Sequence, residues 1–175
     1  MKQKLAEKAP YYLLALIVLS LDQYTKLLAL QHLSYANPVP VFEHLNWTLL
    51  FNRGAAFSFL SNAGGWQHWL LGGLAVGVSI FIVVYLYKLP RQAWMLSLAL
   101  ALVLGGAVGN VYDRFTLGYV VDFIDVYLQQ CSFLQAWFPA CHWPAFNIAD
   151  AAICVGAILL LLDAFLNADA GKAAP

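Results

Sequence analysis

The sequence predicts an α-helical polytopic membrane protein with four transmembrane helices, a small extracytoplasmic β-rich platform and an interfacial helix or loop. Two observations carry this prediction. The 175 residues are 62% hydrophobic and only 10% charged, with a mean hydropathy of +0.71, whereas a soluble domain usually carries about a quarter charged residues. Apolar runs also recur along the chain, each about as long as the 20 residues that a bilayer span needs. We expect one membrane-embedded domain over residues 1–175.

The first span is predicted over residues 11–30. Three lysines precede it, as in a signal peptide, but the apolar run continues and no small-residue cleavage site closes it, so we expect it to be retained. Asp22 and Lys26 stand four residues apart and share one helix face. Two interpretations stay open. The pair either lies at the membrane edge, where Lys26 snorkels to water, or Asp22 braces polar groups from other elements.

A β-rich platform is predicted over residues 37–62. The stretch mixes aromatic and β-branched residues with polar ones, as short strands do. Asn52, Arg53 and Gly54 give a turn signal, after which residues 54–60 return as a second strand. Asn52 is either a solvated hairpin residue or part of a functional site.

The remaining spans are predicted over residues 66–87, 92–112 and 144–166. Tryptophan and tyrosine flank the second span, which is typical of interfacial aromatic belts. The late half of the third span is rich in glycine and alanine over residues 105–109, which allows close helix approach. These features agree with a bundle of four helices.

The segment 115–143 is too polar to span a membrane, and we expect an outer loop there. Residues 126–143 are expected to hold a short amphipathic interfacial helix. Cys131 and Cys141 share this loop, and the sequence leaves free thiols and a disulfide equally open. Cys154 lies in the fourth span, where we expect a small buried hydrophobe.

Basic residues set the predicted orientation. The lysines before the first span, Lys88 with Arg91, and Lys172 all fall on one side of a four-span arrangement. The positive-inside rule then places both termini in the cytoplasm and the platform with the outer loop on the opposite side. The net charge is zero and there is no long basic run, so nucleic-acid binding has no support.

In this topology the unusual polar residues gather at one face of the membrane. They are Asp22, Asn52, Asn110, Asp113, Arg114, Asp122, Asn147 and Asp150. Charged groups at the edge of a span are costly and are functional candidates by default. Structural alternatives stay open, since Asn147 and Asp150 fit a helix-capping box and Asp113 with Arg114 fits a helix-end salt bridge. Metal-ligand spacing, nucleophile motifs and phosphate loops do not occur in the sequence.

A paired-carboxylate reaction is the chemistry that remains. Two carboxylates held close together share a proton, so that the ionised member activates water and the protonated member donates to the scissile carbonyl. Asp122 and Asp150 form the best pair, because one follows the third span and the other opens the fourth. Asp150 lies in a first helical turn, where the dipole favours the ionised form, so we assign it as the base. Asp125 is expected to be a solvent-facing neighbour.

Five segments resemble the lipoprotein signal peptidases (signal peptidase II), the aspartyl peptidases of the bacterial inner membrane. They are DQYTK at 22–26, FNRGAAFS at 51–58, GGAVGNVYDR at 105–114, VVDFID at 120–125 and FNIAD at 146–150. Their order and spacing cover nearly the whole chain. The connection between the last two segments is longer than is usual for the family, and the extra part includes Cys131 and Cys141.

The resemblance implies cleavage of diacylglyceryl-modified prolipoproteins before the lipid-carrying cysteine, with Asp122 and Asp150 as the catalytic dyad. It implies that Asn52, Asn110, Arg114 and Asn147 orient substrate or dyad, with Asp22 and Asp113 as supporting carboxylates. It also implies inhibition by the cyclic peptide globomycin, contact with membrane lipid and no metal or organic cofactor. We expect a monomer in the bacterial inner membrane, with the active site at the periplasmic face.

Two other classes of function are open to a chain of this composition. A small ion- or proton-coupled transporter would distribute polar residues across the bilayer depth, whereas here the polar residues lie at one end of the spans. A non-catalytic lipid-binding or assembly protein would use the aromatic platform and would tolerate the loss of any single carboxylate.

Overall fold

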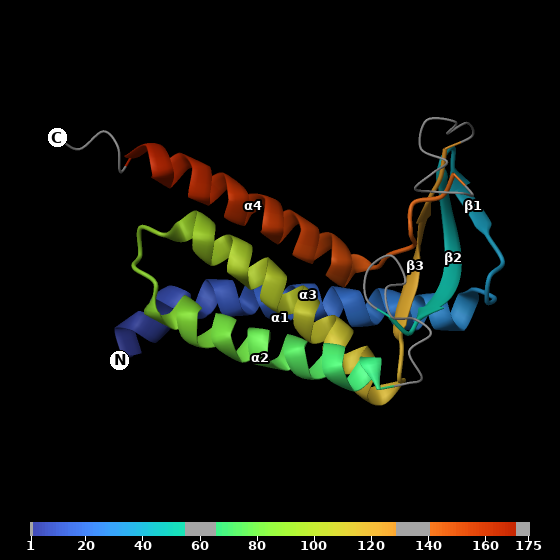
Figure 1. The fold of residues 1–175 in the computed structure, drawn as a ribbon, viewed down its shortest axis with the longest axis horizontal. Helices are drawn as coiled ribbons and strands as arrows, with labels where there is room; N and C mark the ends of the chain where they lie inside the picture. Colours follow the sequence, from blue (N-terminus) through green and yellow to red (C-terminus); the bar gives the residue numbers. More distant parts are fainter. Residues whose placement is uncertain (1, 55–65, 129–140, 171–175) are drawn as a thin grey trace. The chain divides into compact units, whose positions relative to one another are not determined.

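The computed structural model describes residues 2–54, 66–128 and 141–170. Within these ranges four helices are long and apolar enough to cross a membrane. The helices are α1 (Lys2–His32), α2 (Gln67–Lys88), α3 (Trp94–Thr116) and α4 (Ile148–Ala170), and the strands are β1 (Val39–Phe42), β2 (Leu45–Asn52) and β3 (Val120–Val126) (Figure 1). The predicted fold class is therefore confirmed.

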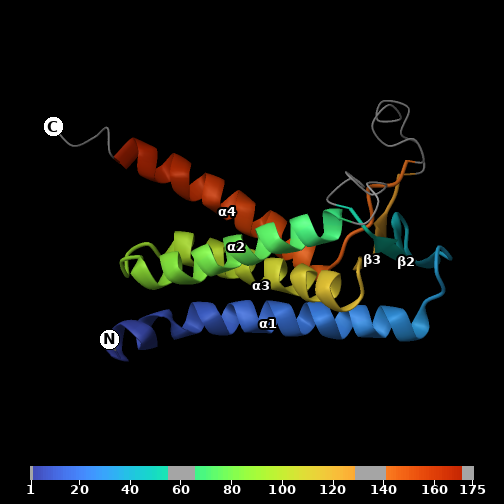
Figure 2. The same ribbon diagram turned by 60° about the horizontal axis from the view of Figure 1, so that its bottom comes forward.

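Helices α1 and α3 extend the predicted spans at their polar ends, whereas α4 begins at Ile148 instead of residue 144. Helix α1 begins at Lys2 instead of residue 11, and α3 continues to Thr116 instead of ending near residue 112. Figure 2 shows α1 as one uninterrupted helix. A helix that continues past the apolar run keeps its backbone groups paired, and it carries polar side chains beyond the hydrophobic stretch.

The chain divides into two compact units, and α1, α2 and α3 each contribute to both. The first unit comprises Met1–Leu21, Leu74–Val111 and Ile148–Pro175, and the second comprises Asp22–Gly73 and Tyr112–Asn147. Each unit is built from segments far apart in the sequence. Each therefore depends on long-range packing.

The first unit has an apolar helical core. Its buried cluster contains Ala15 of α1, Ile82 and Leu86 of α2, and Leu100 and Leu104 of α3. Large apolar side chains on the outer faces of α2 and α4 are exposed, including Ile80, Phe81, Leu161 and Phe165. Exposed apolar surface of this extent marks contact with a membrane, as expected of spanning helices.

Small residues let the helices of the first unit approach closely. A Cβ atom on Gly105 would lie 2.6 Å from the carbonyl oxygen of Ala15 and 2.7 Å from Val18 Cβ. On the other side of α3, a Cβ on Gly106 would meet Ile153 Cγ1 of α4 at 2.8 Å. All three distances are shorter than van der Waals contact, so glycine is required at both positions by the close approach of the helices.

The second unit contains an antiparallel sheet in the order β1-β2-β3. Strand β2 pairs with β1 on one side and with β3 on the other, so that Asn46 lies opposite Asp125 and Leu50 lies opposite Asp122. The sheet thus joins the predicted platform to the segment after the third span. Strand β3 occupies residues 120–126 of the predicted outer loop, so the loop prediction is wrong for that stretch, whose β-branched residues form the third strand of the sheet.

The platform contains a turn that the sequence analysis did not name, in addition to the chain reversal predicted at Asn52. The β1–β2 hairpin closes at Glu43 and His44, where His44 has a positive φ of 72°. At Asn52, β2 ends, and Asn52 Oδ1 accepts a hydrogen bond from the Gly54 amide at 2.9 Å. The return strand predicted over residues 54–60 and most of the predicted interfacial helix lie outside the described residues.

Candidate active site

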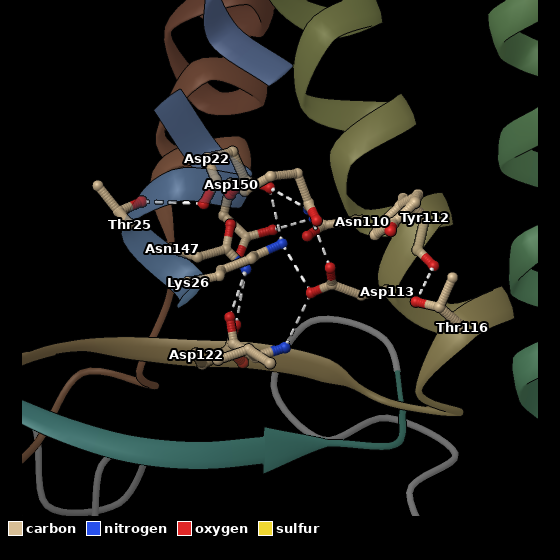
Figure 3. Close-up of polar contacts among 12 residues, drawn as sticks. Asp22, Thr25, Lys26, Asn110, Tyr112, Asp113, Thr116, Asp122, Asn147 and Asp150 are labelled. Carbon is tan, nitrogen blue, oxygen red and sulfur yellow. Dashed lines mark hydrogen bonds and ion pairs between the residues drawn. The ribbon is translucent and has the colours of Figure 1, made fainter. Parts of the chain in front are cut away.

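A buried ion cluster joins α1 to the end of α3 within the second unit. Lys26 Nζ lies 2.9 Å from Asp22 Oδ2 and 2.8 Å from Asp113 Oδ2, and the three side chains are at most 3% exposed. Gln23 Nε2 donates to Asp22 Oδ2 at 3.1 Å and to Asp113 Oδ1 at 2.9 Å. Figure 3 shows Lys26 directed at both carboxylates.

This geometry decides between the two interpretations of Asp22 and Lys26. Lys26 does not snorkel to water, because it is buried between two carboxylates that satisfy its charge. Asp22 therefore braces polar groups from another element. Sequence reasoning missed Gln23, which stands beside Asp22 and contacts both carboxylates.

The ion cluster continues into strand β3. Asp113 Oδ2 accepts a hydrogen bond from the backbone amide of Val121 at 3.1 Å. Val121 is fully buried and immediately precedes Asp122. The bond fixes the backbone of β3 next to Asp122, so the ion cluster positions this strand.

Asp122 is buried in β3 and receives an amide donor. Asn147 Nδ2 donates to Asp122 Oδ1 at 2.8 Å and to the carbonyl of Val121 at 3.2 Å. Asp122 is 3% exposed and Asn147 is fully buried. Asn147 directly precedes α4, the position where asparagine is favoured as a helix cap, and its amide group reaches back to β3.

Asp150 has an equivalent partner within the first unit. Asn110 Nδ2 of α3 donates to Asp150 Oδ1 at 2.7 Å. Asp150 lies in the first turn of α4, where the helix dipole stabilises a negative charge. Asp122 and Asp150 thus each accept a short hydrogen bond from an asparagine amide (Figure 3).

Asn52 and Arg114 both contact Gly54, in the turn that follows β2. Arg114 Nη2 donates to the carbonyl of Gly54 at 3.1 Å, and the Gly54 amide donates to Asn52 Oδ1. The end of α3 is therefore fastened to the loop that begins at Asn52. Instead of the salt bridge between Asp113 and Arg114 that was one open alternative, Asp113 pairs with Lys26 and Arg114 bonds to this loop.

Asp125 was misjudged from the sequence. The prediction of a solvent-facing side chain is wrong, because Asp125 is 5% exposed and accepts three donors. Asn46 Nδ2 lies 3.2 Å and Thr48 Oγ1 2.9 Å from Asp125 Oδ2, and His142 Nδ1 lies 2.6 Å from Oδ1. The signal was that Asp125 shares one strand face with the apolar residues Val121 and Phe123, since side chains two residues apart point the same way.

The cysteines have different surroundings. Cys141 is disulfide-bonded. Cys131, the partner that the sequence analysis considered for a disulfide with Cys141, lies outside the described residues. Cys154 is a free thiol and is exposed, so the expectation of a buried hydrophobe is wrong. An apolar run cannot distinguish a side chain packed inside the protein from one that faces lipid, and α4 exposes much of its apolar surface.

Fold and site together define a multi-pass membrane protein that holds buried carboxylates, an ammonium and asparagine amides at the ends of its helices. The profile of the family "Signal peptidase (SPase) II" matches residues 14–166. The chain belongs to this family of peptidases.

Relatives and solved structures agree with that assignment. The lipoprotein signal peptidase of Acinetobacter baylyi is 56% identical over 152 residues, which cover 87% of this chain and 79% of the relative. That of Teredinibacter turnerae is 50% identical over 93% of this chain and 90% of its own length. A bacterial membrane enzyme solved at 2.3 Å resolution is 28% identical with a TM-score of 0.79, covering 95% of this chain and 93% of that one. A second bacterial membrane enzyme, solved at 1.9 Å resolution, is 30% identical with a TM-score of 0.70. The match covers 88% of this chain and 91% of that one.

Proposed function

We propose that this chain is an aspartyl endopeptidase that removes signal peptides from diacylglyceryl-modified prolipoproteins. It cuts the peptide bond before the lipid-carrying cysteine. Membership of the signal peptidase II family supports this reaction, as do relatives named lipoprotein signal peptidase at 47–56% identity. The observation that carries the proposal is the matched pair of short asparagine–aspartate hydrogen bonds at Asp122 and Asp150.

Asp122 and Asp150 act as the catalytic dyad. One carboxylate is ionised and removes a proton from the attacking water, and the other is protonated and donates to the oxygen of the scissile carbonyl. Asp150 is the base, since the first turn of α4 favours its ionised form. The water oxygen bonds to the carbonyl carbon to give a tetrahedral intermediate. When the intermediate collapses, the proton that Asp150 took from water passes to the leaving nitrogen, the C–N bond breaks and the hydroxyl proton returns to Asp122. The products are the signal peptide with a new carboxyl terminus and the lipoprotein with a free amine on its lipidated cysteine.

The asparagines hold the dyad in orientation. Each donates to one carboxylate oxygen, which restricts the rotation of that carboxylate and fixes the direction of its second oxygen. Asn52 and Arg114, at the turn after β2, orient the substrate, while Asp22 and Asp113 support the site through Lys26. Preorganisation of this kind lowers the barrier without reorganisation during the reaction.

The enzyme works in the bacterial inner membrane, with both termini in the cytoplasm and the dyad at the periplasmic face. The distribution of lysine and arginine supports this orientation. The disulfide at Cys141 agrees with it, because the segment that carries Cys141 would face the oxidising periplasm. The monomer binds lipidated substrate beside membrane lipid, uses no cofactor and is inhibited by globomycin.

The test is a cleavage assay with the purified chain in lipid nanodiscs. A prolipoprotein peptide is supplied with or without the diacylglyceryl group, and mass spectrometry locates the cut. We expect cleavage of the lipidated peptide alone, before the modified cysteine, and inhibition by globomycin. Equal cleavage of both peptides, or a cut elsewhere, would contradict the proposed specificity, and no cleavage of either would contradict the peptidase assignment.

A further inference from the structure

We propose that Asp125 and His142 are positioning residues that hold Asn147 against Asp122. We call the set of Asp125, His142, Asn46 and Thr48 the Asp125 clamp. The inference deepens the proposed function and rests on it, because it assigns to the clamp the orientation of one member of the dyad. All the contacts that carry it lie within the second unit.

Asp125 cannot share the role of Asp122, because the two point to opposite faces of β3. They stand three residues apart in a strand whose side chains alternate between faces. Asp125 lies on the same face as Val121 and Phe123, both buried. A buried carboxylate on that face needs donors to offset its desolvation.

The clamp supplies those donors from two parts of the chain, strand β2 and the segment that leads into α4. Asn46 and Thr48 of β2 donate to one oxygen of Asp125 at 3.2 and 2.9 Å, and His142 Nδ1 lies 2.6 Å from the other oxygen. Two strands and the segment that leads into α4 therefore meet at one carboxylate. Hydrogen bonds to a charged acceptor are about twice as strong as neutral ones.

His142 begins a short segment that lies along β3 and ends at Asn147. The Trp143 amide donates to the Val126 carbonyl at 2.8 Å, and the Phe146 amide donates to the Ile124 carbonyl at 3.1 Å. The segment 142–147 thus extends the sheet as an irregular edge. Its far end places the Asn147 amide 2.8 Å from Asp122 Oδ1.

The chemistry of the clamp requires a donor at His142 Nδ1. An ionised carboxylate only accepts hydrogen bonds, so Nδ1 carries the proton that lies between His142 and Asp125. The His142 ring also stacks on Tyr127, with ring centroids 5.4 Å apart and planes at 23°. The ring of Tyr127 also makes an edge contact with the ring of His44. His44 Nε2 lies 3.7 Å from Glu43 Oε1.

Two variants of His142 separate the hydrogen bond from the ring contact. His142→Phe keeps an aromatic ring for Tyr127 but removes the donor, whereas His142→Asn keeps a donor near the position of Nδ1 and removes the ring. Loss of a hydrogen bond to a charged group should lower kcat about tenfold in His142→Phe, with KM changed less than about twofold. His142→Asn should retain kcat within about threefold of the wild type.

The matched control is Glu43→Gln, a change of an exposed carboxylate on the β1–β2 hairpin, and its kcat should equal that of the wild type.

A double variant tests whether the Asp125 clamp acts on catalysis through Asn147. If the clamp acts through Asn147, the double variant with His142→Phe and Asn147→Ala should be no slower than Asn147→Ala alone. Multiplied losses in the double variant, or equal activity of His142→Phe and His142→Asn, would overturn the proposal.

Hydrogen exchange gives a readout that does not depend on cleavage. The amides of residues 142–147 should exchange about tenfold faster in His142→Phe than in the wild type or in His142→Asn. Should His142→Phe fail to fold, the isosteric variant Thr48→Val, which removes one donor to Asp125, takes its place in both experiments with the same coupling expected. Unchanged exchange overturns the clamp alone, whereas a wild-type chain that does not cleave lipidated peptide overturns the proposed function alone.

Discussion

Replacement of Lys26 by methionine should destabilise the protein strongly. Methionine keeps the apolar stem of the side chain but removes the ammonium that lies 2.9 Å from Asp22 and 2.8 Å from Asp113. Both carboxylates are essentially inaccessible to solvent. The variant therefore leaves two like charges buried near each other without their cation.

The magnitude follows from the burial. Removing one partner of a buried ion pair costs about 3–5 kcal/mol. Gln23 still donates to both carboxylates in the variant, and Asp113 keeps the Val121 amide as a donor. We therefore expect the lower end of that range, about 3 kcal/mol in the free energy of unfolding.

The assay is reversible unfolding in mixed micelles, followed by tryptophan fluorescence. The matched control is Lys88→Met, which removes an exposed lysine from the last turn of α2 and should cost less than about 1 kcal/mol. Combining Lys26→Met with Asp22→Asn and Asp113→Asn should recover part of the loss, because no buried charge then remains unpaired. A Lys26→Met variant as stable as Lys88→Met would refute this reasoning.

Three further predictions test the site and the helix packing. Asn147→Ala and Asn110→Ala should each lower kcat about 10- to 100-fold with smaller effects on KM, since each removes a donor to one dyad carboxylate; wild-type steady-state rates would contradict this. The plot of kcat against pH should be bell-shaped, because protonation of both dyad carboxylates removes the base and ionisation of both removes the acid. A kcat that rises monotonically with pH would exclude a shared proton. Gly105→Ala should cost about 1–3 kcal/mol in unfolding free energy, while Gly77→Ala, where a Cβ meets nothing within 4 Å, should not destabilise; equal stabilities would contradict the packing argument.

The helical part of the fold could be predicted from the sequence because its signal is local. Each apolar run has the length and composition of a membrane span, and the glycines of α3 indicate that neighbouring helices pack closely against it. The pairing of Asp22 with Lys26 follows from their spacing on one helix. The second carboxylate of that cluster, Asp113, lies far along the chain, so spacing could not reveal that Lys26 is buried between the two.

The third strand of the sheet could not be predicted because its partner β2 is distant in sequence. Strand β2 pairs with β3 across two membrane spans, and only this pairing places Asn46 opposite Asp125. The two aspartates of β3 made the segment look like a polar loop. In the structure one carboxylate is buried on each face of the strand, and each is offset by its own donors.

The most direct test of the two-aspartate mechanism is cleavage of the lipidated peptide by Asp122→Asn and Asp150→Asn, each purified and shown to be folded. Asparagine preserves the shape of the side chain but can neither hold nor release the catalytic proton. Asp163→Asn, the same change at a partly buried carboxylate elsewhere on α4, is the control. The mechanism predicts that both dyad variants lose cleavage while the control retains the wild-type rate, and normal turnover by either dyad variant would contradict it.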